Sequence, residues 1–145
     1  MEKFNNYLKD IGLTSIPFTE KIEPVYNICC QMCPEEIKDI FITNYIKNDA
    51  NEEFVNLWFF SDKYCLEAKQ FLTKYDLDIT YIYQSIKYWN IKLEDYSYND
   101  ISNKSKLFLE AESVFGIALI LRAQGKNCGY LKAIIDKYFK PNTIF

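Results

Sequence analysis

The stretch that decides the fold class is residues 106–139, KLFLEAESVFGIALILRAQGKNCGYLKAIIDKYF. Over Lys106–Glu112 apolar side chains alternate along the chain, which predicts a strand with one apolar face. That face would consist of Leu107, Leu109 and Ala111. Phe115–Ala123 is a short, nearly continuous apolar run, and it predicts a strand buried on both sides. Together the two segments predict an antiparallel hairpin near the end of the chain.

A helix is expected directly after this hairpin. Residues 124–127 (QGKN) favour a turn, and Asn127 is placed to cap a helix over about Cys128–Phe139. Pro141 would prevent its continuation. Four apolar residues recur at the spacing of one helical face: Leu131, Ile134, Ile135 and Tyr138. Charged residues that fall largely away from this stripe should meet water: Lys132, Asp136 and Lys137.

Segments earlier in the chain add further strands. Glu36–Ile46 is rich in β-branched and aromatic residues, and Phe54–Phe60 (FVNLWFF) is too short and too aromatic for a helix. Tyr64–Tyr75 has two interpretations, because its composition favours a helix while its first residues also permit the return strand of a hairpin. Residues 79–89 are open to a helical interpretation through Ile79, Ile82, Ile86 and Trp89. From Trp89 to Leu93 the apolar period is two, which predicts a strand.

The N-terminal part is expected to be a small addition to this body. Glu2–Asp10 predicts a short amphipathic helix that ends near Gly12, and Thr14–Pro24, with two prolines, predicts an irregular connection. We therefore predict one α+β domain over residues 1–145, with a body over 35–145. Its expected architecture is a bent antiparallel sheet, or a partly open barrel, closed by the C-terminal amphipathic helix.

This order of elements resembles the pleckstrin-homology-like (PH-like) superfamily, including its small bacterial proteins, over about Glu36–Pro141. The resemblance is carried by FVNLWFFSDKYCLEAKQF (54–71), by IYQSIKYWNIKLEDY (82–96) and by the closing hairpin and helix. Lipid-binding members of that superfamily hold inositol phosphates on a basic loop between the first two strands. The matching loop here, Lys47–Glu53 (KNDANEE), carries three carboxylates, so phosphoinositide binding is not expected.

Composition limits the function classes. The chain has 145 residues, 49% hydrophobic and 17% aromatic, which favours a packed core. Its formal net charge of -3 and single arginine, Arg122, argue against a nucleic-acid partner. We expect a cytoplasmic protein that is not embedded in a membrane, because no signal peptide is recognisable and the longest apolar run is Val114–Leu121. The sequence contains no histidine, which removes Ser-His and Cys-His nucleophiles. No catalytic residue and no cofactor are predicted.

The cysteines carry the sharpest local motif. Cys30 and Cys33 have the spacing of redox and metal-binding pairs, and Cys65 and Cys128 could complete a four-thiolate zinc site. No second CxxC pair is present, so burial of the five cysteines as small apolar side chains is the favoured interpretation.

Aromatic residues point to a binding function. Alternate residues of a strand face opposite sides of the sheet, so some aromatic rings are expected outside the core. The candidate surface consists of Trp58, Tyr81, Tyr83, Tyr88 and Trp89. The favoured hypothesis is a non-enzymatic module that contacts a protein partner through an aromatic sheet face or edge, with a homo-oligomer as one possibility. The alternatives are a thiol-dependent redox protein using Cys30 and Cys33, or a small acidic protein of the immunity or inhibitor type.

Overall fold

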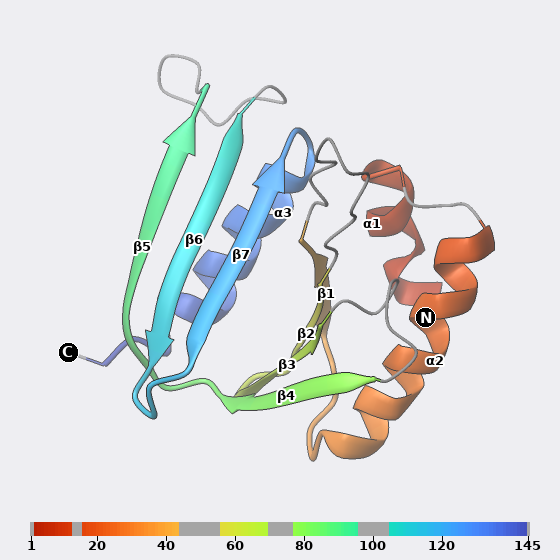
Figure 1. Cartoon of the computed structure of the whole chain (residues 1–145), viewed down its shortest axis with the longest axis horizontal. Helices are drawn as coiled ribbons and strands as arrows, with labels where there is room; N and C mark the ends of the chain where they lie inside the picture. The colour runs from red at the N-terminus through yellow and green to blue at the C-terminus, as the bar shows by residue number, and fades with distance from the viewer. Residues whose placement is uncertain (1, 13–15, 44–55, 70–76, 96–104, 145) are drawn as a thin grey trace. The chain divides into compact units, whose positions relative to one another are not determined.

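The computed structural model describes residues 2–12, 16–43, 56–69, 77–95 and 105–144 (Figure 1). Its elements are η1 (Glu2–Phe4), α1 (Asn5–Asp10), α2 (Ile16–Met32), β1 (Asp39–Ile42), β2 (Leu57–Phe60), β3 (Tyr64–Lys69), β4 (Asp78–Tyr83), β5 (Ile86–Glu94), β6 (Lys106–Ser113), β7 (Ala118–Gln124), α3 (Asn127–Ile134) and η2 (Ile135–Phe139). The strands form two antiparallel sheets, in the orders β1-β2-β3-β4 and β5-β6-β7. The predicted α+β class is confirmed.

Contacts divide the chain into two compact units, Met1–Tyr81 and Ile82–Phe145, with the boundary inside β4. The first holds the two N-terminal helices and most of the four-stranded sheet, and the second holds the three-stranded sheet and the C-terminal helix. The single domain expected over residues 1–145 stays a prediction.

In the first unit, strand β2 is buried on both faces, as its uninterrupted apolar sequence predicts. Phe59 points to the side of α2, where its ring centroid lies 5.6 Å from that of Tyr26. Trp58 points to the other side and stacks on Phe60 at 6.3 Å. The registers Phe59↔Leu66 and Trp58↔Glu67 pair β2 with β3. The hairpin interpretation of Tyr64–Tyr75 is thereby confirmed over β3, whereas residues 70–75 and the loop Lys47–Glu53 lie outside the described residues.

The N-terminal helices correct one prediction. The short helix ending near Gly12 is confirmed, and Tyr7 accepts a 2.8 Å hydrogen bond from the Ile42 N–H at the end of β1. The irregular connection predicted over Thr14–Pro24 is wrong, because α2 begins at Ile16 and contains Pro24. Pro17 lies in the first turn, where no backbone N–H is needed, and burial further along α2 offsets the bond lost at Pro24. The buried residues are Ile22, Val25 and Cys29.

In the second unit, α3 lies along one face of the sheet β5-β6-β7 (Figure 1). The alternation predicted for β6 is confirmed, since its burial pattern changes at every residue. Phe115–Ala123 does not form a strand buried on both sides. Phe115 is 73% exposed in the turn before β7, and the strand itself alternates between buried and exposed residues. The reason is that α3 covers one face of the sheet only.

The C-terminal helix follows its predicted stripe, whose four apolar residues are all buried. Asn127 does not cap it. The helix begins at Asn127 itself, which is buried, and the Cys128 N–H bonds to the Gly125 carbonyl at 3.1 Å instead. Gly125 has a positive φ of 62°, which lets the chain turn tightly into the helix. The last turn widens into the π-helix η2, closed by a 3.0 Å bond from the Lys140 N–H to the Ile135 carbonyl, before Pro141 ends it.

Truncating the stripe should destabilise the protein strongly. Replacing Ile134 or Ile135 by Ala should lower the free energy of unfolding by about 2–5 kcal/mol, because each leaves a cavity under the sheet. Lys132→Ala, on the exposed side of the same helix, should cost no more than about 0.5 kcal/mol. Urea unfolding followed by circular dichroism checks all three. Equal, small losses would show that α3 does not close the core.

A buried carboxyl on β3 should give a pH-dependent response. Burial raises the pKa of Glu67 above its ordinary value, although Lys69 and a 2.8 Å hydrogen bond from Asn56 Nδ2 oppose that shift. The folded state therefore holds this proton more tightly than the unfolded chain does, and the ionised carboxylate costs stability once the pH exceeds the unfolded pKa. Glu67→Gln should raise the urea midpoint at pH 7 more than at pH 4. Glu23→Gln, an exposed control on α2, should show no such difference.

Candidate protein-binding surface

The sheet β5-β6-β7 has a second face, turned away from α3, that we call the outer face. On β6 the residues that alternate with the buried Leu107, Leu109 and Ala111 belong to it. The registers place matching residues of β5 and β7 beside them. The outer face consists of Tyr88, Asn90, Lys92 and Glu94 on β5, Lys106, Phe108, Glu110 and Glu112 on β6, and Ala118, Ile120, Arg122 and Gln124 on β7. All twelve are exposed or half-buried.

A register shift at the start of β5 decides which aromatic ring reaches this face. Ile86 pairs with Ser113 and Tyr88 with Glu112, so Lys87 is an additional residue in β5. An extra residue inverts the alternation of all that follow. Tyr88 consequently points to the outer face, where it is 52% exposed, and its neighbour Trp89 points to the side of α3.

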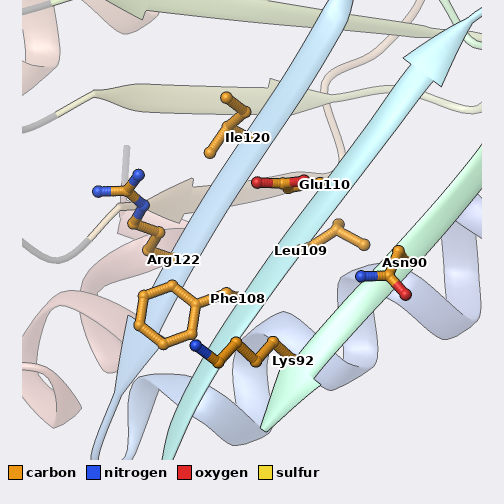
Figure 2. A pocket seen from close by; sticks show the side chains of 7 residues that line it. All are labelled: Asn90, Lys92, Phe108, Leu109, Glu110, Ile120 and Arg122. Atoms are coloured by element: carbon orange, nitrogen blue, oxygen red, sulfur yellow. The ribbon is translucent and has the colours of Figure 1, made fainter.

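A pocket of about 270 Å³ lies at the centre of the outer face (Figure 2). One row across the three strands is Lys92, Phe108 and Arg122, so the ring of Phe108 has a cation on either side. The Arg122 guanidinium lies 6.0 Å from the centroid of that ring. The neighbouring row is Asn90, Glu110 and Ile120. The pocket thus combines an aromatic ring and an aliphatic side chain with charges of both signs.

The charges at this pocket differ in how they are satisfied. Lys92 forms an ion pair with Glu94 at 3.2 Å, in which the lysine side chain is largely in water and the glutamate side chain is partly buried. Within the part of the chain that the structure describes, Arg122 and Glu110 form no ion pair. Both are therefore available to charged groups of a partner.

Of the predicted aromatic surface, Trp58 is fully buried and Trp89 is half-buried. Trp58 is 0% exposed, because the alternation of β2 sends its indole into the core beside Phe60. Trp89 is half-buried on the side of α3, and its indole N–H donates a 3.1 Å hydrogen bond to Thr143 Oγ1. The predicted exposure is therefore wrong for Trp58, whereas a binding role of the half-buried Trp89 stays a prediction.

Tyr81 and Tyr83 are exposed, by 42% and 46%, but they lie on β4, which belongs to the other sheet. Tyr81 stacks on Tyr64 with ring centroids 5.0 Å apart. Partial burial, with further contributions from Tyr64, Cys33 and Glu35, raises the pKa of Tyr81 to about 12. Of the five predicted residues, only Tyr88 lies on the outer face.

The cysteines lie at the end of α2 and elsewhere in the core. Cys29 and Cys33 are buried, Cys30 is exposed, and burial raises the pKa of Cys29 to about 12. Cys65, opposite Phe60, points to the face of its sheet away from α2, so it does not complete a zinc site with Cys30 and Cys33. Among the described residues no group of three potential metal ligands occurs. Cys30 lies in the last turn of α2 and Cys33 follows directly after it. Thiolates are stabilised at the N-terminus of a helix, so the position of this pair at the C-terminal end does not favour reactive thiolates.

Sequence reasoning missed most of the pocket, although part of the signal was present. The alternation that assigned Leu107 and Leu109 to the core also assigns Phe108 and Glu110 to the opposite face. Arg122, charged and in the middle of an apolar run, indicated that β7 has an open side. The bulge at Lys87 left no signal in the sequence.

We found no protein-family model, no curated protein and no solved structure that matches this chain. None of the helices in the described ranges is both long enough and apolar enough to cross a bilayer.

Thiol reactivity should separate Cys30 from the other cysteines. At pH 8 a thiol-reactive dye should modify Cys30 rapidly, because it is the exposed one, and the four buried thiols should react only after unfolding in urea. Cys30→Ser should abolish the rapid phase. A rapid phase that survives this substitution would mean that Cys29 or Cys33 is accessible in the folded protein.

Proposed function

We propose that this protein is a non-enzymatic binding module that contacts a protein partner through the outer face of β5-β6-β7. The observation that carries the proposal is a sheet face on which Tyr88, Phe108 and Ile120 accompany an arginine that has no ion pair among the described residues. Within the described part of the second unit, one helix covers the opposite face and no segment covers the outer one.

The composition of this face supports a protein partner over a small molecule. Aromatic residues and arginine are enriched in protein interfaces, and hot spots are enriched in Tyr, Trp and Arg. Arg122 is the only arginine of the chain, and it lies against the Phe108 ring, in the pocket. The pocket has about 270 Å³, slightly below the usual range of roughly 300–1,000 Å³ for ligand sites. A single side chain of a partner suits that volume.

The thiol-dependent alternative has less support. Cys30 and Cys33 lie at the C-terminal end of α2, where the helix dipole disfavours a thiolate. An acidic inhibitor would be a special case of the binding module with a particular partner. We further propose a cytoplasmic location, without nucleic-acid or phosphoinositide binding.

Kinship with the PH-like superfamily is also a proposal. It is supported by the order of elements in the described ranges, in which strands β1 to β7 are followed by the C-terminal helix α3. The four-plus-three division of these strands into two antiparallel sheets is in keeping with a partly open barrel.

Photo-crosslinking tests the binding face. A photoreactive phenylalanine analogue is placed at Tyr88 or at Ile120, both on the outer face, or at Lys132 on the exposed side of α3 as the control. In a lysate of the source cells, the two outer-face positions should give the same crosslinked product and Lys132 should give none. Unlabelled wild-type protein should compete for that product, and an Ile120→Glu/Arg122→Glu variant should not. Crosslinks from Lys132 alone, or equal competition by the variant, would contradict the proposal.

A further inference from the structure

We infer that the partner of the outer face is a second copy of this chain, packed sheet on sheet about a two-fold axis that crosses the strands. This inference rests on the proposed function of that face and names its partner. It is carried by the pattern of charges along and across β6.

The outer face has a negative half and a net positive half, because three cations (Lys92, Lys106 and Arg122) outnumber the single carboxylate, Glu94, that lies beside Lys106. Along β6, Glu112 and Glu110 lie toward one end, and Lys106 lies at the other. Between them, Phe108 is flanked across the strands by Lys92 and Arg122. Because residues i and i+2 of a strand are roughly 7 Å apart, the two ends are separate but within reach of one facing sheet.

A two-fold axis between the Glu110 row and the Phe108 row makes these ends complementary. It places β6 antiparallel over its copy, so Glu112 faces Lys106 of the second copy, and the reverse contact follows by symmetry. Glu110 then points toward the copy's Phe108 and the two cations beside it. The pockets lie next to the axis and face one another, so Phe108 and Ile120 lose water, and Tyr88, in the Glu112 row, faces the copy's Glu94. Aligned sheets that cross at about −30° pack in this way.

The alternative two-fold axis, running along β6, is excluded by the same charges. It would place Glu110 and Glu112 over their own copies and Lys92 over Arg122. Like charges facing one another across an interface repel. The charge pattern therefore selects one of the two symmetric arrangements.

The predicted dimer is weak. A three-stranded face is smaller than the roughly 800 Å² per partner of a standard interface. Association should consequently depend on concentration and should weaken as added salt screens the exposed charges.

Sedimentation velocity tests the dimer over a concentration series from about 10 µM to about 1 mM, the range in which a weak complex dissociates. The wild-type protein should shift from monomer to dimer, and less so in high salt. Glu112→Lys alone and Lys106→Glu alone should each raise the dissociation constant at least about tenfold, because two attractive contacts become repulsive. The double variant should return to within about threefold of the wild type, since the swapped charges again match.

The control is Lys132→Glu, which makes the same charge change on the exposed side of α3 and should leave the dissociation constant unchanged. Circular dichroism shows that each variant is folded. A monomer throughout the series, or a double variant as weak as the single ones, would overturn the dimer. A crosslink from Tyr88 to a different protein would at the same time leave the proposed function standing. Loss of all outer-face crosslinks would contradict both.

Discussion

The structure of the second unit depends on one constraint. Successive side chains of a strand point to opposite faces of the sheet, and a single helix can bury only one of these faces. Strand β6 sends Leu107, Leu109 and Ala111 toward α3 and must send Phe108 and Glu110 the other way. The four-residue stripe of α3 covers the first set. Nothing in the described part of the unit covers the second. The same alternation that builds the core therefore creates the binding surface.

The bulge at the start of β5 decides which side chains of this edge strand face α3 and which face outward. The extra residue at Lys87 turns Tyr88 outward and Trp89 inward. The C-terminal segment then holds this position, because Ile86 forms a bridge with Thr143, and the Trp89 indole donates to the Thr143 hydroxyl. A large ring is thereby anchored on the inner side, and a tyrosine with a polar tip is presented to the partner.

The sequence predicted those parts of the fold in which a periodic pattern coincides with burial, such as β6 and the stripe of α3, whereas for Tyr64–Tyr75 it left a helix and a hairpin strand open. It did not predict that α2 continues across Pro24. The low helix propensity of proline can be read from the sequence alone, whereas the burial of Ile22 and Cys29, which stabilises the helix, depends on tertiary packing. It could not show that β7 has an open side, since an apolar run does not reveal what covers it. For the candidate site, only Tyr88 was anticipated. Trp58 and Trp89 were assigned to a surface because their direction depends on register, and for Trp89 the sequence does not show the bulge that sets it.

Hydroxyl-radical footprinting of the free protein at low concentration shows whether the outer face is open to solvent, because it reports the solvent contact of individual side chains. We expect rapid modification of Tyr88 and Ile120 and slow modification of Leu119 and Leu121, their neighbours on the inner side, until the protein is unfolded. Similar rates for Ile120 and Leu121 in the folded protein, or protection of Tyr88, would contradict an outer face that is open to a partner.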